Sequence, residues 1–373
     1  PHQPPPHQPP PPQRPSPPQQ PPPQRPSPHR LPSPLRFLRH QRPSLHRLPS
    51  PLQPPVAADT LPRIAARATT RIMSCDALVV VTLHDPLQTA AGHGSRLAQR
   101  AIDRLHQLEQ SWSRFLPTSE ISGLNDAGGE PRIASSDTVR LVEALVQAWH
   151  ATSGSFDPTL LGALVQLGYA ASRDDATLRT SLGAEIVAQG NPAGILIDPD
   201  TGWIQLPHGT TLDPGGLGKG LAADIVVEEL IDAGAAGALV EIGGDMRVSG
   251  QPPTGEAWTI AVAPVAEDDK TRFVQLCDGG VATSTSRLRT WVHDGEQRHH
   301  LIDPRTLRSA DADTISCSVI AGSAAWAEAF TKVAFAEQVP SALECYDARG
   351  LAASITTTDR RQHDSNVWKE FCR

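Results

Sequence analysis

The amino-acid sequence predicts an α+β fold with mixed sheets and flanking helices. Two observations support this class. Amphipathic helical patterns cluster early in the globular part of the chain, whereas strand patterns crowd its later half. These patterns also do not alternate as regular β-α-β units, which argues against a doubly wound parallel sheet. The globular part has about 300 of the 373 residues, enough for one large domain or two closely joined lobes.

The individual elements follow from hydrophobic periodicity and turn residues. Apolar residues from Leu97 to Trp112 recur at spacings of three and four, which is typical of an amphipathic helix. The turn sequence D-P-D-T-G separates two short apolar runs and predicts a hairpin. In chain order we predict a strand over 77–84, helices over 95–113 and 138–151, a hairpin over 195–197 and 203–206, a helix from 216 to about 233 and a strand over 238–242. The later elements are strands over 258–263, 271–276, 289–293, 314–320 and 352–358 and a helix over 324–336.

Residues 1–71 differ sharply in composition from the rest of the chain. They hold 24 of the 37 prolines, ten arginines and a single acidic residue, Asp59, and the heptapeptides PPQRPSP and HRLPSPL each occur twice. Such a segment buries too little apolar surface to offset its chain entropy. We therefore expect a disordered, low-complexity tail over 1–71 and a globular domain over 73–373. The tail is either a linker, an upstream extension of the gene model before Met73, or a ligand for proline-recognising domains.

Net charge and cysteine content limit which partners and which cellular compartment we expect for the protein. The tail carries about +9, so a net charge of −7 leaves −7 − 9 = −16 on the remainder, which argues against a nucleic-acid partner. No apolar run has the length of a membrane span. The five cysteines are widely spaced, without C-x-x-C, which favours reduced thiols and a cytoplasmic location.

The segment 212–224 reads L-D-P-G-G-L-G-K-G-L-A-A-D and is the strongest candidate for ligand binding. Gly215 and Gly216 allow a sharp backbone bend, and the helix start that follows presents unpaired N–H donors suited to phosphate. Lys219 adds a positive charge one turn into that helix. The alternative is a simple loop that leads into a helix. Neither a P-loop nor a G-x-G-x-x-G fingerprint is present.

Further candidates suit the other parts of a nucleotide ligand. Trp112, Phe115 and Phe156 are candidates for stacking on a flat ring, although such residues are more often simply part of the core. Asp157 precedes a proline, which predicts a helix N-cap.

A second charged group, His300, Asp303 and Arg305, lies near the end of the sequence. Arg305 can grip phosphate oxygens, and His300 can accept a proton near neutral pH. The alternative is that Asp303 and Arg305 only clamp the turn around Pro304.

Five sequence blocks together resemble the ApbE family, the FAD:protein FMN transferases. The resemblance runs from about residue 76 to about residue 358, with the blocks in the family's order. The blocks read W-S-R-F…S-E-I-S-G-L-N over 112–125, G-S-F-D-P-T over 154–159, D-P-G-G-L-G-K-G-L-A-A-D over 213–224, E-I-G-G-D over 241–245, and A-T-S with H-H-L-I-D-P-R-T over 282–306.

The resemblance implies the fold, the reaction and the site. The flavin nucleotide would lie between two lobes, and FMN would pass from FAD to a Thr or Ser hydroxyl of a client protein with release of AMP. A divalent cation, Mg²⁺, would polarise the pyrophosphate. The implied catalytic residues are Asp213, Lys219 and His300. The implied FAD-binding residues are Trp112, Phe115, Ser155, Phe156, Asp157, Gly215, Gly216, Lys219, Thr283, Ser284, His300, Asp303 and Arg305. The implied metal positions are Gly218, Glu328 and Lys332.

The chain departs from the family pattern at the metal site. The family has an aspartate and, four residues later, a threonine on the late helix, where this chain has Glu328 and Lys332. A protonated lysine cannot be a metal ligand, so Lys332 marks a position only, but it can pair with Glu328. Either Lys332 replaces much of the metal's charge and transfer depends weakly on Mg²⁺, or the protein binds FAD without transferring FMN. Further alternatives are an FAD pyrophosphatase and an interaction protein that acts through its proline-rich tail.

Overall fold

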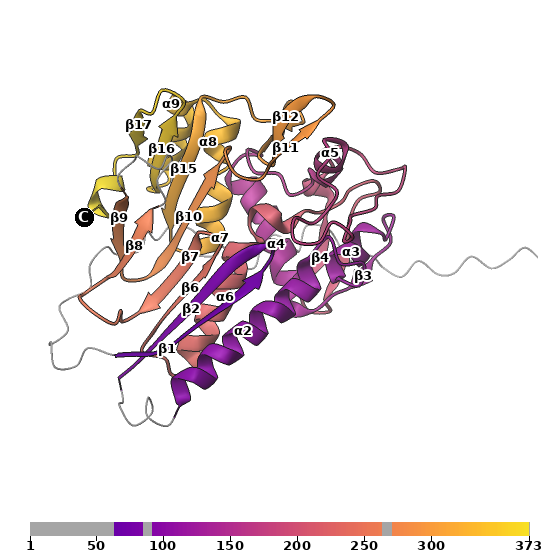
Figure 1. Cartoon of the computed structure of the whole chain (residues 1–373). Coiled ribbons are helices and arrows are strands. Elements are labelled where there is room, and N and C mark those ends of the chain that lie inside the picture. Colours follow the sequence, from indigo (N-terminus) through magenta and orange to yellow (C-terminus); the bar gives the residue numbers. More distant parts are fainter. Residues whose placement is uncertain (1–62, 85–91, 263–270, 373) are drawn as a thin grey trace, which may run out of the picture. The chain divides into compact units, whose positions relative to one another are not determined.

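An eight-stranded antiparallel sheet is the centre of the fold (Figure 1). The computed structural model describes residues 63–84, 92–262 and 271–372. Neighbouring strands in the sheet follow the order β1-β2-β6-β7-β10-β15-β16-β17. Their bounds are β1 Arg63–Ile72, β2 Cys75–Leu83, β6 Gly237–Ile242, β7 Asp245–Gly250, β10 Gly279–Thr285, β15 Thr314–Ala321, β16 Ala352–Thr357 and β17 Gln362–Asp364.

Smaller sheets and the helices surround this central sheet. The small antiparallel sheets pair β3 (Arg132–Ile133) with β5 (Trp203–Gln205) and β4 (Leu196–Asp198), β8 (Trp258–Val262) with β9 (Arg272–Leu276), β11 (Thr290–His293) with β12 (Glu296–His299), and β13 (Ile302–Asp303) with β14 (Arg308–Ser309). The helices are α2 His93–Trp112, α3 Glu120–Asn125, α4 Ser136–Ala151, α5 Leu161–Gln166, α6 Gly218–Asp232, α7 Ala324–Phe330, α8 Val333–Ala336 and α9 Val339–Ala348. None of the helices in the described residues is long and apolar enough to cross a membrane.

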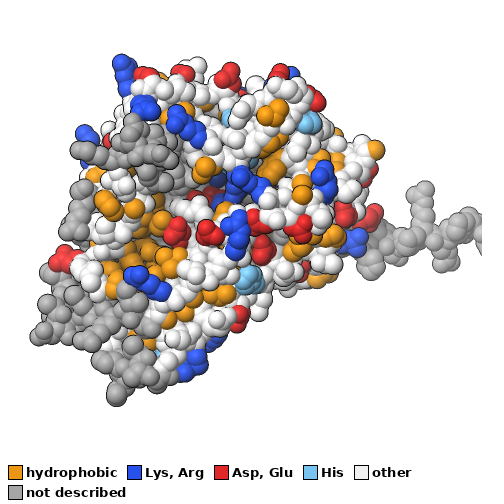
Figure 2. All heavy atoms as spheres, in the orientation of Figure 1, with side chains coloured by type: hydrophobic (Ala, Val, Ile, Leu, Met, Phe, Trp, Pro, Cys, Tyr) orange, Lys and Arg blue, Asp and Glu red, His pale blue; other side chains and the backbone are white. Residues whose placement is uncertain are grey.

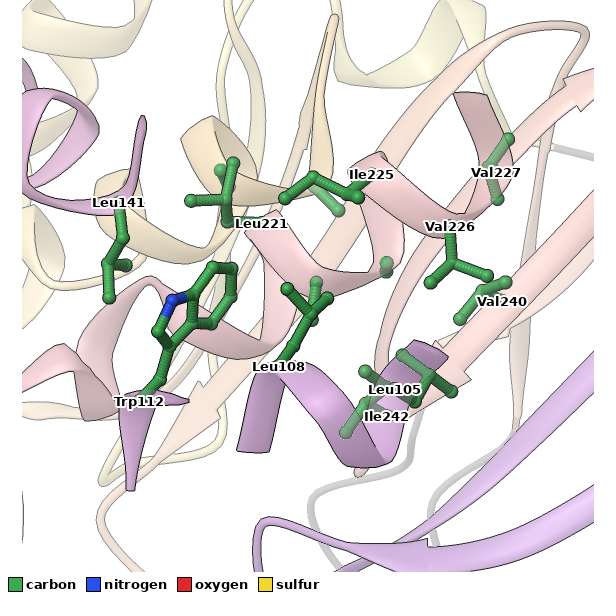
Figure 3. Packing of buried hydrophobic residues seen from close by; sticks show 14 of the residues in the cluster. Leu105, Leu108, Trp112, Leu141, Leu221, Ile225, Val226, Val227, Val240 and Ile242 are labelled. Atoms are coloured by element: carbon green, nitrogen blue, oxygen red, sulfur yellow. The ribbon is translucent and has the colours of Figure 1, made fainter. Parts of the chain in front are cut away.

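Hydrophobic clusters cover both faces of the central sheet. Successive side chains of a strand point to opposite faces, so Val79 and Val81 of β2 pack with α2 and α6, whereas Val80 packs with Trp258 of β8 and with Trp368. Figure 3 shows the helix side of this core, where the apolar stripe of α2 meets α6 and the strand β6. The stripe that predicted α2 is therefore the face that the helix buries.

Helix α7 is fixed against α6 and β10 by two close approaches and a cap. A Cβ atom at Gly220 of α6 would lie 2.4 Å from the carbonyl oxygen of Ala324, and one at Gly280 of β10 would lie 2.2 Å from the Ala324 nitrogen. Asp224 of α6 accepts hydrogen bonds from the N–H groups of Ala324 (2.8 Å) and Ala325 (2.9 Å). The start of α7 is therefore held through its own backbone donors.

The predicted α+β class is confirmed, but the prediction of mixed sheets is wrong, because the strands paired in the described residues are all antiparallel. Most predicted elements are present within two residues of their expected bounds. Two further predictions are wrong. The sheet already includes Arg63–Ile72 as β1, so the tail cannot extend to residue 71; residues 1–62 lie outside the described part of the chain. The single late helix over 324–336 is divided into α7 and α8, with a break at Thr331 and Lys332. The strands β7 and β10 were not predicted.

The close approach at Gly220 predicts a large stability difference between two glycine positions. We expect Gly220→Ala to push α7 away from α6 and lower the free energy of unfolding by about 1–3 kcal/mol. The matched control is Gly123→Ala in α3, where a Cβ atom would meet nothing within 4 Å. That change should be neutral or stabilise by about 0.5–1 kcal/mol. Denaturant unfolding of both variants tests this, and equal stabilities would contradict it.

Candidate functional site

A cavity of about 460 Å³ lies where the start of α6, the end of α2 and the β10 strand meet. Figure 2 shows Lys and Arg side chains next to Asp and Glu side chains in the middle of the displayed face. Every residue that the sequence placed in the site lines this cavity, except Asp303 and Arg305. The segments that provide these residues lie far apart in the sequence, so the fold brings them together.

The glycine-rich segment forms a short 3₁₀ turn, Pro214–Gly216, and the helix α6 begins only at Gly218. The Asp213 carboxylate closes the turn by accepting the N–H of Gly215 at 2.9 Å. A Cβ atom at Gly216 would lie 2.7 Å from the Phe156 ring and 3.4 Å from Cε of Lys332, so only glycine fits there. The first turn of α6 leaves N–H donors without intrahelical partners at the cavity.

Four charged side chains, which we call the charge cluster, lie beneath this turn: the buried carboxylates of Asp245 and Glu328, and Lys219 and Lys332, whose side chains are 11% and 17% exposed. The Lys219 ammonium contacts Oδ2 of Asp245 at 2.6 Å and Oε1 of Glu328. The other Glu328 oxygen accepts the N–H of Gly220 at 2.8 Å. Lys332 donates from Nζ to the Glu328 carbonyl oxygen at 2.8 Å. Glu328 is only 1% exposed, so this carboxylate depends on these partners for its charge.

Burial and pairing shift the pKa values of the two ammonium groups in opposite directions. Burial opposes the charge of Lys219, but Asp245 and Glu328 outweigh it and raise its pKa. Burial lowers the pKa of Lys332 to about 8, because the attraction of Glu328 only partly offsets the lost hydration. Burial raises the pKa of Glu328, yet Lys219 and Lys332 outweigh it and lower that pKa. At pH 7 the charge cluster therefore holds two cations and ionised Glu328.

The residues at the implied metal position do not fit Mg²⁺. This ion requires nearly octahedral coordination by oxygen atoms at 2.0–2.1 Å. Both carboxylate oxygens of Glu328 already accept hydrogen bonds, and its carbonyl oxygen accepts from Thr331 and Lys332. Within the described ranges, no group of three or more His, Cys, Asp or Glu side chains could hold a metal. Gly218 and Glu328 line the cavity, but a lysine lies where a further ligand would be needed.

An arginine and aromatic rings form another wall of the cavity. The Arg114 guanidinium lies 4.1 Å from the ring centre of Phe115 and 4.9 Å from that of Tyr169. Its Nε atom is 3.6 Å from Asp213 Oδ1, which connects this wall to the glycine turn. Trp112 and Phe156 are 1% and 4% exposed and belong mainly to the core, as their alternative interpretation expected.

Hydrogen bonds to other protein groups fix the polar side chains of the site. Asp157 accepts the N–H of Thr159 at 2.7 Å and closes a turn. The prediction that Asp157 caps a helix is wrong, because α5 begins at Leu161 with Leu160 as its N-cap. Two cavity hydroxyls are paired with hydroxyls of the neighbouring chain segments: Thr283 with Ser318 at 2.8 Å and Ser284 with Thr331 at 2.6 Å.

His300 lines the cavity, whereas Asp303 and Arg305 do not. Burial, helped by the nearby cations Arg289 and Lys332, keeps the pKa of His300 well below 6.5, so the imidazole is neutral at pH 7. Its Nδ1 atom has no hydrogen-bond partner in the part of the chain that the structure describes. Arg305 is 61% exposed and donates to Asp303 at 3.1 Å, which is the turn clamp of the alternative interpretation.

A rim contact still connects Arg305 to the site. Arg305 lies 3.6 Å from the Glu337 carboxylate, which accepts a hydrogen bond from the cavity residue Ser155 at 3.2 Å. Sequence reasoning missed many other lining residues, and those that the site description above uses are Arg114, Tyr169, Asp245 and Arg289. Arg114 and Asp245 lie inside the quoted sequence blocks and could have been selected there. Tyr169 and Arg289 carry no comparable signal.

Comparisons with known proteins agree with this site. The family model described as "ApbE family" matches residues 73–355. The FAD:protein FMN transferase of Vibrio cholerae is 28% identical over 233 residues, which cover 61% of this chain and 69% of that protein. The protein of the same name from Chlamydia trachomatis is 29% identical over 266 residues, covering 69% of this chain and 82% of the relative.

Solved structures show the same fold. The crystal structure of the ApbE protein from Thermotoga maritima matches this chain with a TM-score of 0.71 at 22% identity. The match covers 83% of this chain and 99% of the Thermotoga maritima chain. The structure of the flavin transferase ApbE from Vibrio cholerae matches with a TM-score of 0.66 at 20% identity. The match covers 82% of this chain and 98% of the Vibrio cholerae chain.

Because Glu328 is buried, we predict that it contributes far more to the free energy of unfolding than the exposed Glu228. We expect Glu328→Gln to lower the free energy of unfolding by about 3–5 kcal/mol, because it leaves two buried ammonium groups with one fewer anion. The matched control is Glu228→Gln, which removes an ion pair with Arg140 whose side chains are 50% and 45% exposed. That loss should stay within about 1 kcal/mol. Urea unfolding at pH 7 measures both, and a small effect of Glu328→Gln would contradict the buried network.

Proposed function

Because the chain belongs to the ApbE family, we propose that it is an FAD:protein FMN transferase. The observation that carries the proposal is the single cavity where the glycine turn, the start of α6 and the ammonium groups of Lys219 and Lys332 converge. FAD has a pyrophosphate, which needs N–H donors and cations, and flat rings, which need aromatic or apolar walls. The cavity offers the first at the glycine turn and the second beside Phe115 and Tyr169.

The proposed reaction joins FMN to a client protein. The hydroxyl oxygen of a Thr or Ser attacks the FMN phosphorus, a new P–O bond forms, and the P–O bond to AMP breaks. AMP leaves with the bridging oxygen, and the hydroxyl proton passes to a base. We propose His300 as that base, since its neutral imidazole lines the cavity.

The other predicted residues receive proposed roles from their contacts. Asp213 positions the Gly215 turn and the Arg114 side chain rather than contacting the reacting atoms. Lys219 and the N–H groups at Gly216 and Gly218 would face the pyrophosphate. Charges held in place before the ligand arrives stabilise the pentavalent transition state without reorganisation.

A second candidate function is FAD binding without transfer. The observation that favours it is the charge cluster, whose carboxylates do not fit a divalent cation. FAD hydrolysis by water is a third, weaker candidate. We also propose a client protein with a Thr or Ser acceptor as the partner. A cytoplasmic location is proposed from the five free cysteines alone.

The functions are distinguished by AMP release from FAD. The full chain is incubated with FAD, with and without a peptide that carries a client flavinylation site. A transferase gives AMP and an equal amount of FMN-modified peptide only when the peptide is present. AMP without the peptide would indicate a pyrophosphatase. Tight FAD binding with no AMP in either reaction would overturn transferase activity in favour of the binding protein.

The proposed base predicts a specific defect in His300→Gln. We expect AMP release to fall by about 10²–10⁴-fold, whereas the FAD dissociation constant changes little. The wild-type rate should not fall between pH 7 and pH 6.5, because the lowered pKa keeps His300 neutral there, and should fall only at lower pH. The control is His208→Gln, at an exposed position outside the cavity lining. An unchanged rate in His300→Gln would exclude His300 as the base.

A further inference from the structure

The Lys332 side chain lies in a fixed position beneath the glycine turn. Its Cε atom packs where a side chain at Gly216 would begin, and its Nζ atom donates to the Glu328 carbonyl oxygen at 2.8 Å. The side chain is 17% exposed and lines the cavity. The ammonium group is therefore available to a ligand on one side and anchored to protein on the other.

The break between α7 and α8 produces this position. The Glu328 carbonyl oxygen, near the end of α7, accepts from Nζ of Lys332 and from Oγ1 of Thr331 at 2.6 Å. A lysine that satisfies a terminal carbonyl also interacts favourably with the helix dipole. Because Thr331 in turn bonds to Ser284 of β10 at 2.6 Å, the break is tied to the central sheet.

The positive charges around Lys332 disfavour the binding of a divalent metal ion. Lys219 contacts both Asp245 and Glu328, Lys332 lies 3.9 Å from Glu328, and Arg289 adds a further positive charge at the cavity wall. A divalent ion placed beside Glu328 would meet two ammonium groups at short range and would have to displace one of them. A pyrophosphate, by contrast, brings negative charge to the same place.

We propose that Lys332 is a catalytic residue that supplies, as part of the protein, the positive charge that neutralises the FAD pyrophosphate, so that this chain needs no divalent cation. The inference rests on the proposed function, because it concerns the same cavity and the same substrate. It requires that Lys332 acts on both ligand affinity and turnover. A lysine that only fills space would affect neither once its volume is replaced.

The test compares the full chain with Lys332→Met, which keeps the packing against Gly216 and removes the charge. Lys369→Met, at an exposed lysine outside the cavity lining, is the matched control. FAD affinity is measured by flavin fluorescence, and AMP release with acceptor peptide by chromatography, each in EDTA and in 5 mM Mg²⁺ (about a typical assay level). We expect wild type and control to differ by less than about twofold between EDTA and Mg²⁺. We expect Lys332→Met to bind FAD about tenfold more weakly and to release AMP about a hundredfold more slowly in both conditions.

Two results would overturn the inference. One is wild-type activity that disappears in EDTA and returns with Mg²⁺; the other is a folded Lys332→Met variant with unchanged FAD affinity and turnover. If Lys332→Met does not fold, the wild-type comparison of EDTA with Mg²⁺ decides alone.

If the wild type releases no AMP under any condition, the proposed function fails separately. FAD binding then decides the inference: equal affinity in EDTA and Mg²⁺ supports it, and binding that requires Mg²⁺ overturns it.

Discussion

The buried contact between Lys219 and Glu328 is the interaction on which the site depends. Lys219 lies in the first turn of α6 and Glu328 in α7, and Asp245 at the start of β7 completes the contact. An isolated charge in such a buried place is unstable, so each of these groups requires the others. The contact thereby fixes the start of α6, with its unpaired N–H donors, relative to the two elements that form the cavity floor.

Backbone packing supports this electrostatic arrangement. Glycines at 220 and 280 let α7 approach both α6 and β10 more closely than any side chain would allow. Asp224 then binds the first N–H groups of α7, and Arg247 lies 3.2 Å from the same carboxylate. These contacts hold the first turn of α7, and Glu328 lies about one turn further along the same helix. The cavity floor therefore follows from this packing of α6, α7 and β10.

The sequence predicted the elements whose signal is local and missed those that depend on distant contacts. The stripe of α2 and the apolar run of β15 could be recognised without knowing their neighbours. The break at Lys332 could not, because it requires the Glu328 carbonyl oxygen and Ser284 from another strand. Most of the site residues that the sequence predicted came from five blocks of family-like sequence, and they make up fewer than half of the cavity lining. Asp303 and Arg305 were misplaced because a short-range ion pair, formed within three residues, competes with any role in the cavity.

The separation of the charge cluster along the chain has a consequence for biosynthesis. Lys219 and Asp245 are synthesised well before Glu328 and Lys332. Strand β15 is made shortly before Glu328, and β16 is made after Lys332. Until α7 is made, Lys219 has only one of its two carboxylate partners, and the floor of the cavity is missing. The nascent chain therefore completes this cavity only near the end of synthesis, and a product truncated before α7 lacks the cavity floor.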